Sequence, residues 1–258
     1  MDTRMTTRRE VLQLGALGAA GLAGTQVPRD GSSGGGAGQL APANTPVPYR
    51  GVFRRPPELL PYATTFDDGD PNRPVDHFAL TQRLGRMQIL PGLTTTVAGY
   101  NGTFPGPTIR AKRGTRIELR MRNGFPEAPG LLLPQRTDTS THLHGSPSLP
   151  QYDGYANDIT APGFVKTYKY PNGEKASTLW YHDHRHLVTA QNVYSGMAAF
   201  YPISDVFEQA QLPQGEFDVP LMVSDAEFNA NGCSRSTTTT PRACGETSSW
   251  STGWPGRR

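Results

Sequence analysis

Short alternating runs of apolar and polar residues, separated by turn-forming residues, constrain the fold of this chain more than any other feature. In TRIELRMRN, Ile117, Leu119 and Met121 alternate with arginine and glutamate residues, which is the period-two pattern of a half-buried strand. Asn-Gly pairs in YNGTF, RNGF and YPNGE predict turns between such runs. No long segment of helical periodicity interrupts them. The body is therefore predicted to be all-β, an antiparallel sandwich or barrel.

The two ends of the chain differ from this body. Residues 1–26 hold adjacent arginines followed by the apolar run VLQLGALGAAGLAG, which is too short to span a bilayer stably. This pattern predicts a twin-arginine export signal, and an ordinary amphipathic helix is the alternative. Residues 27–50 predict a flexible linker because they contain GSSGGGAG and few apolar groups. We expect the body at residues 51–232 and an irregular tail at residues 233–258.

The formal net charge of +3 arises at the ends of the chain. Residues 1–26 contribute +1 and the residues from Cys233 onward contribute +3, which leaves the body close to neutral. A basic patch that would indicate nucleic-acid binding is therefore not predicted. Once the signal has been removed, no membrane anchor is expected, and the location is predicted to be periplasmic, cell-surface or extracellular.

Two H-x-H motifs stand out in a chain with six histidines. His142 and His144 form one in THLHG, and His182 and His184 form the other in WYHDHRH. On a strand, residues i and i+2 point to the same face, about 6.5–7 Å apart at the backbone. Two such pairs could be brought together in an antiparallel sheet. Four imidazoles without a thiolate suit copper, zinc, iron or nickel, and the affinity order favours copper.

The remaining histidines and the residue between the second pair have simpler interpretations. His186 would share the face of His184 only if the strand continued, and the polar run TAQN indicates that it does not. His77 is isolated in VDHFAL and is interpreted as an ordinary strand residue. Asp183 would point away from the imidazoles, either as a group that supports the ligands or as a solvent-facing strand residue. Trp180 is interpreted as a packing residue.

The combination of YNGTFPGPTIRAKRGTRIELRMRN, THLHG followed by DGY, and LWYHDHRHLVTAQNVYSGMAAFYPISD resembles the first cupredoxin domain of a multicopper oxidase. The resemblance runs over about residues 76–225 and is closest to the bacterial laccase group, which includes spore-coat laccase, phenoxazinone synthase and bilirubin oxidase. It implies a Greek-key cupredoxin fold. It also implies an enzyme that couples one-electron oxidation of phenols, aromatic amines or metal ions to reduction of O2 to water.

The resemblance further implies a role for each paired histidine. His142 would bind the type 2 copper of a trinuclear cluster. His144 and His182 would bind one type 3 copper, and His184 would bind its partner. The family pattern needs eight such histidines and a separate type 1 copper site. The H-P-x-H-x-H and H-C-H-x-x-x-H motifs that complete it do not occur in this sequence, because no histidine follows His186.

A shift of reading frame is the hypothesis for this difference. From Cys233 the sequence loses every strand pattern, and the neighbouring frame of ACGETSSWSTGWP can encode GLWGDVILVNGVA, which contains the family-like DVILVNG. The chain is then expected to be a truncated, inactive fragment whose missing cupredoxin domains would pack against the body. Cys233 and Cys244 could otherwise form a disulfide, but an out-of-frame tail would make them incidental.

Other functions remain open at this stage. A copper- or zinc-binding β domain that works alone would need only the four histidines. A blue-copper electron carrier is disfavoured because it needs a cysteine beside the histidines. An oxidase assembled from several chains is also disfavoured, since two-domain family members carry their own H-C-H motif. Zinc bound tightly with copper excluded would contradict the oxidase interpretation.

Overall fold

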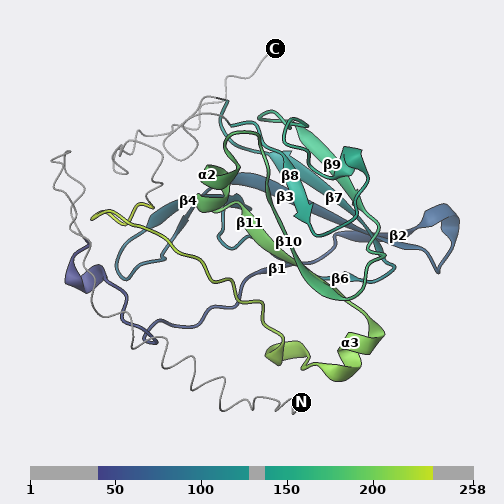
Figure 1. Cartoon of the computed structure of the whole chain (residues 1–258), viewed down its shortest axis with the longest axis horizontal. Coiled ribbons are helices and arrows are strands. Elements are labelled where there is room, and N and C mark those ends of the chain that lie inside the picture. The colour runs from purple at the N-terminus through teal and green to yellow at the C-terminus, as the bar shows by residue number, and fades with distance from the viewer. Residues whose placement is uncertain (1–39, 128–136, 235–258) are drawn as a thin grey trace, which may run out of the picture. The chain divides into compact units, whose positions relative to one another are not determined.

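The computed structural model describes residues 40–127 and 137–234, which belong to one compact unit (Figure 1). The predicted signal at 1–26, most of the linker at 27–50 and nearly all of the tail at 233–258 lie outside these residues. The described end of the linker is mostly exposed. Within the described residues, no helix combines the length and the apolar character needed to cross a membrane.

Five strands form the first sheet, in the order β2-β3-β7-β9 with β4 also paired to β3. The strand β3 is long enough to pair with β2 near its beginning and with β4 near its end, while β7 lies along its other edge. The bounds of these strands are Ala63–Phe66 for β2, Pro74–Met87 for β3, Thr95–Tyr100 for β4, Arg116–Asn123 for β7 and Val165–Tyr170 for β9.

Four strands form the second sheet, in the order β6-β11-β10-β8. The central pair, β10 and β11, is antiparallel, and β8 lies at one edge of the sheet. The bounds are Ala111–Lys112 for β6, Thr141–His144 for β8, Ser177–Asp183 for β10 and Ala198–Ser204 for β11. A separate parallel pair joins β1 (Glu58–Leu59) to β5 (Thr108–Ile109).

The helices of the described residues are all short. They are the α-helices α2 (Thr189–Tyr194) and α3 (Val206–Gln211) and the 3-10 turns η1 (Pro42–Asn44), η2 (Asp67–Gly69), η3 (Pro150–Tyr152) and η4 (Gly215–Phe217). The helix α2 is the next element after β10 and begins at the TAQN run, which the sequence marked as the end of a strand.

The prediction of an all-β sandwich is confirmed, whereas the prediction of purely antiparallel sheets is wrong. The pairs β3–β7, β6–β11 and β1–β5 are parallel. Between β3 and β7 the chain crosses to the other sheet through β5 and β6 and then returns, and such a crossover lets two neighbouring strands run in the same direction.

The alternating pattern of Arg116–Asn123 predicts its strand correctly. Ile117, Leu119 and Met121 are almost completely buried, and the charged residues between them face outward. Of the predicted Asn-Gly turns, the pair Asn101-Gly102 has positive φ at both residues, as a tight hairpin requires. RNGF is different, because Asn123 belongs to β7 and is buried there.

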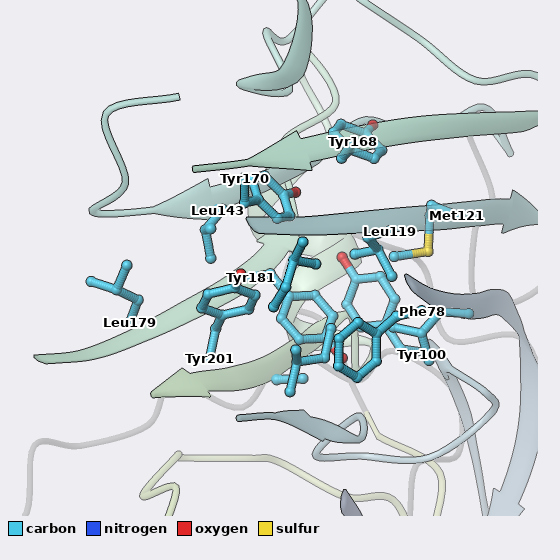
Figure 2. Close-up of a cluster of buried hydrophobic side chains, with 14 of the residues drawn as sticks. Phe78, Tyr100, Leu119, Met121, Leu143, Tyr168, Tyr170, Leu179, Tyr181 and Tyr201 are labelled. Carbon is cyan, nitrogen blue, oxygen red and sulfur yellow. The ribbon is translucent and has the colours of Figure 1, made fainter. Parts of the chain in front are cut away.

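The core lies between the two sheets and is rich in tyrosine. Figure 2 shows side chains of both sheets pointing into the space between them. Tyr100, Tyr168, Tyr170, Tyr181 and Tyr201 are at most 1 % exposed. Burial of an aromatic ring removes a large apolar area from water, so this layer is the main source of hydrophobic stabilisation of the sandwich.

Cys233 differs from its interpretation as an incidental residue. Its side chain is buried and disulfide-bonded, and the sequence contains only one other cysteine, Cys244. That residue lies outside the described residues. The backbone around Cys233 is tied to Asn229, whose side-chain oxygen accepts a hydrogen bond from the Cys233 N–H at 3.0 Å.

Candidate metal centre

Strand pairing brings the two H-x-H motifs together. The strands β8 and β10 are antiparallel neighbours, and their register places His142 opposite His182 and His144 opposite Trp180. Because alternate strand residues share a face, both pairs point away from the core, whereas Leu143 within the first pair and Tyr181 directly before the second are completely buried in it.

The four imidazoles form one compact group. The ring centre of His142 lies 5.5 Å from those of His144 and His182 and 5.3 Å from that of His184. One nitrogen from each of His142, His144 and His182 lies within 4.8 Å of the others. His144 Nδ1 and His182 Nε2 are 3.3 Å apart. The structure thus brings all four predicted residues together, and three of them offer nitrogens close enough to share one ion.

Backbone carbonyls orient two of the rings. His142 Nδ1 lies 2.6 Å from the carbonyl oxygen of Asp153, and His182 Nδ1 lies 2.8 Å from that of Asp183. A carbonyl oxygen only accepts, so each Nδ1 carries the proton and each Nε2 is unprotonated, with that of His182 facing His144 Nδ1. Such bonds to the second ring nitrogen are typical of metal-binding histidines.

His184 contributes a nitrogen without a hydrogen-bond partner. It follows the last residue of β10, and its Nδ1 is buried and unpaired. An unpaired buried nitrogen is costly unless it binds something. The donor set of the site therefore includes one unpaired imidazole nitrogen and two imidazoles with an unprotonated Nε2, which fits a metal that prefers neutral nitrogen ligands.

Burial keeps two of these histidines neutral. It lowers the pKa of His182 to about 4, with a smaller contribution from the neighbouring histidines, and the hydrogen bond to the Asp183 carbonyl opposes the shift. Burial and the nearby His142 also lower the pKa of His184. Near neutral pH both rings are uncharged, which is the form that binds metal ions.

A large cavity adjoins the imidazoles. Its volume is about 1260 Å³, and all four histidines line it. Trp180 and Phe200 of the second sheet line it as well, together with α2 and the extended segment Leu221–Phe228. Trp180 stacks on His182 with ring centres 4.2 Å apart and on His144 at 5.2 Å.

His186 and His77 lie apart from this group, as expected. His186 is exposed in the turn after β10, and it does not line the cavity. His77 lies on β3, where its Nε2 is 2.8 Å from the Thr65 hydroxyl and its Nδ1 is 3.6 Å from Glu118. The strand does end at Asp183, which explains why the third alternate histidine leaves the face.

Asp183 corrects one expectation from the sequence. Asp183 is completely buried, so its interpretation as a solvent-facing residue is wrong. Burial raises the pKa of its carboxyl group to about 7, against hydrogen bonds from Asn192 and Ser140.

Asp153 is a residue of the site that the sequence did not assign. It belongs to the DGY that follows THLHG, and its position shortly after His142 is the sequence feature that could have indicated its contact with that ring.

Comparison with known proteins agrees with this geometry. Residues 83–206 match the multicopper oxidase family. Bilirubin oxidase from Albifimbria verrucaria is 44 % identical over 149 residues, which is 56 % of this chain and 24 % of that protein. A laccase from Haloferax volcanii is 31 % identical over 254 residues, which is 88 % of this chain and 41 % of that protein.

A solved structure shares the fold. The multi-copper oxidase of Pediococcus acidilactici is similar with a TM-score of 0.60 and 25 % identity, over 79 % of this chain and 39 % of that chain. The chain thus spans well under half the length of these relatives. Residues 83–206 thus form a domain of the multicopper oxidase family, and both converging H-x-H pairs lie within it.

Proposed function

We propose that this chain supplies half of the ligands of a trinuclear copper cluster in a laccase-like oxidase. The observation that carries the proposal is the pairing of His142 with His182, which gathers four imidazoles beside one cavity. By resemblance, His142 binds the type 2 copper, His144 and His182 bind one type 3 copper, and His184 binds the other. When bound, the copper ions supply the redox chemistry that couples one-electron oxidation of phenols, aromatic amines or metal ions to reduction of O2 to water.

The residues of this chain hold and orient the ligands. The carbonyl oxygens of Asp153 and Asp183 fix the rings of His142 and His182 with Nε2 unprotonated. Trp180 restricts the rings of His182 and His144 by stacking. Such preorganisation lowers the entropy that metal binding would otherwise cost.

The other ligands would come from further cupredoxin domains. The chain spans 24 % to 41 % of the length of its two relatives described above, and its sequence contains no H-C-H motif. We therefore expect O2 reduction only when the remaining cluster ligands and a type 1 copper site are supplied by domains that pack on this one.

A stand-alone metal-binding β domain is the second candidate function. Nitrogens of His142, His144 and His182 lie within 4.8 Å of one another, which would allow a single copper or zinc ion to be held without any further domain. Zinc accepts three histidines with an open fourth position, and copper accepts the same donors.

Competitive metal loading of the full chain separates the oxidase proposal from a structural zinc site. Copper and zinc are offered together, and the bound metal is quantified after removal of the excess. We expect copper in wild-type chain and its loss in His182→Ala. Stoichiometric zinc with copper excluded would contradict the oxidase proposal and support a structural zinc site.

We also propose that the protein is exported by the twin-arginine route. The adjacent arginines Arg8 and Arg9 before an apolar run support this proposal. Replacement of both arginines by lysine should retain a fused reporter inside the cell. Export that continues unchanged would contradict the proposed route.

A further inference from the structure

Asp183 occupies an unusual place between two of the candidate ligands. It is the last residue of β10, and its neighbours in sequence are His182 and His184. Its side chain points away from their face and is 0 % exposed. A buried carboxyl group is costly unless hydrogen bonds compensate the loss of water, so its partners are informative.

Three N–H groups from three different segments donate to this carboxylate. The backbone N–H of Ser140 donates to Oδ1 at 2.9 Å. The backbone N–H of Arg185 donates to Oδ2 at 3.1 Å, and the side-chain amide of Asn192 donates to the same oxygen at 2.8 Å. The carboxylate therefore joins the residue before β8, the turn after β10 and the helix α2.

The bond to Ser140 acts on the first H-x-H pair. Ser140 lies directly before the four-residue strand that carries His142 and His144. Its carbonyl oxygen accepts a hydrogen bond from the backbone N–H of His184 at 2.7 Å. Both Ser140 N–H and Ser140 C=O are thus held by the segment of the second pair, directly before β8 begins.

The bonds to Arg185 and Asn192 act on the second pair. The turn after Asp183 carries His184, and its first amide after that histidine is the Arg185 N–H. Asn192 is 1 % exposed, and its carbonyl oxygen accepts from the backbone N–H of Met197, while the Met197 carbonyl accepts from the Asp183 N–H. The helix and the end of β10 are therefore locked to each other around the carboxylate.

We propose that Asp183 is a positioning residue that holds the two H-x-H pairs at the mutual spacing required for copper binding. It touches no ligand nitrogen with its carboxylate. It accepts one bond from the segment of the first pair and two from the segments that fix His184, so loss of the carboxylate frees both pairs relative to each other. This inference rests on the proposed function of the site.

Asp183→Asn tests the inference with little change of volume. An amide has one acceptor oxygen, and its NH2 group would face an N–H donor, so at least one of the three bonds is lost. We expect the Cu(II) affinity of the full chain, measured by competition with a chromogenic chelator, to fall roughly 10–100-fold, as it does when partners of metal ligands are removed elsewhere. The EPR hyperfine splitting of bound Cu(II) should change as well.

Tyr201→Phe is the matched control. The Tyr201 hydroxyl donates to Asn172 Oδ1 at 2.9 Å, and both residues are completely buried. This variant also loses a buried hydrogen bond but not one that involves Asp183 or a candidate ligand. It should lower the unfolding temperature and leave the copper affinity and the EPR spectrum unchanged.

The outcomes separate the inference from the proposed function. If wild-type chain binds copper and Asp183→Asn binds it with the same affinity and spectrum, the positioning role is wrong while the proposed function stands. If wild-type chain binds no copper, both fall. Should Asp183→Asn fail to fold, Asn192→Ala decides, since it removes one donor and keeps the carboxylate: a several-fold loss of affinity supports the role, and an unchanged affinity overturns it.

Discussion

The two strands that carry the paired histidines are held in different ways. The strand β10 is central in its sheet and is paired with β11 along six residues and with β8 along four. Its own backbone ladder therefore fixes the direction of His182, which is only 4 % exposed. The placement of His182 follows from ordinary sheet formation.

The strand β8 is a short edge strand and depends on side chains. Its first residue, Thr141, donates its backbone N–H to the Tyr168 hydroxyl of the other sheet at 3.0 Å. The Thr141 hydroxyl accepts from the side-chain amide of Gln82 at 3.1 Å, and the preceding Ser140 donates to Asp183. Among the described residues, β10 is the sole strand that pairs with it.

This difference shows how the same H-x-H motif can need different support. On a central strand, two backbone ladders place His182, so side-chain changes that act on this strand alone should affect stability more than metal affinity. On an edge strand with one ladder, buried side chains from the other sheet and from β10 set the position. Substitutions that act on β8 should therefore change the metal site more than equivalent substitutions around β10.

The largest effect is expected from loss of a ligand on the central strand. His182→Ala removes the most buried imidazole, whose Nε2 lies close to His144. Copper affinity should fall by more than roughly 100-fold, because even removal of a ligand's partner costs about 10–100-fold. His186→Ala changes an exposed residue in the turn after β10. It is the control and should bind copper as wild type does. Equal affinity of both variants in chelator competition would exclude His182 as a ligand.

A clash against the edge strand should come next. Gly154 has a φ of +72°, and a Cβ there would lie 2.0 Å from the carbonyl oxygen of Thr141, so Gly154→Ala must displace β8. Gly163→Ala is matched, since Gly163 has a φ of +85° but open space around it. The control should cost only the left-handed backbone strain of about 1–2 kcal/mol, whereas Gly154→Ala should cost more and also weaken copper binding.

Chemical denaturation and copper titration of both glycine variants check this prediction. If Gly154→Ala is destabilised no more than Gly163→Ala and binds copper normally, the contact between residue 154 and β8 does not constrain the site.

The sequence predicts the regular parts of this arrangement well. Alternation places Ile117, Leu119 and Met121 in the core and puts each pair of histidines on one strand face. The end of β10 before His186 follows from the polar run after it. These features depend on neighbouring residues, so local periodicity is enough to find them.

The parts that sequence reasoning missed depend on contacts distant along the chain. The carboxylate of Asp183 is buried because Ser140, 43 residues before it, and Asn192, nine residues after it, meet at its position. The parallel pairing of β3 with β7 likewise depends on a crossover through the other sheet. Asn123 in RNGF bonds the carbonyls of Thr137 and Thr160 instead of turning the chain.

Alkaline pH should reveal the layer that supports both strands. Burial raises the pKa of Tyr168 from its ordinary value of 10 to about 12, against hydrogen bonds from Thr141. Burial also raises the pKa of Tyr181 well above 10. A raised pKa of a phenol means that folding favours the neutral form, so the stabilisation is complete below pH 10 and is lost as the pH rises from 10 toward 12. The rise of the Tyr168 pKa from 10 to about 12 corresponds to roughly 3 kcal/mol of folding stability.

An alkaline titration checks the direction of this pH dependence. Tyrosinate absorbance and circular dichroism are followed together through and above the range where exposed tyrosines ionise, at about pH 10. The buried tyrosines should ionise only as the β signal is lost. Ionisation of all ten tyrosines near their ordinary pKa with the β signal retained would contradict the tight tyrosine layer.

The smallest effect should distinguish the two strands most directly. Tyr168→Phe leaves the buried Thr141 N–H of the edge strand without its acceptor, and Tyr181→Phe leaves the Pro107 carbonyl without the hydroxyl that donates to it. Each variant should lose about 1–3 kcal/mol of stability. Only Tyr168→Phe should also speed hydrogen exchange of the Thr141 amide and lower copper affinity, by less than roughly tenfold since no ligand or ligand carbonyl is removed. Because Tyr181 lies on the same strand as His182, a loss of copper affinity in Tyr181→Phe as large as that in Tyr168→Phe would show that the edge strand has no special dependence on side chains.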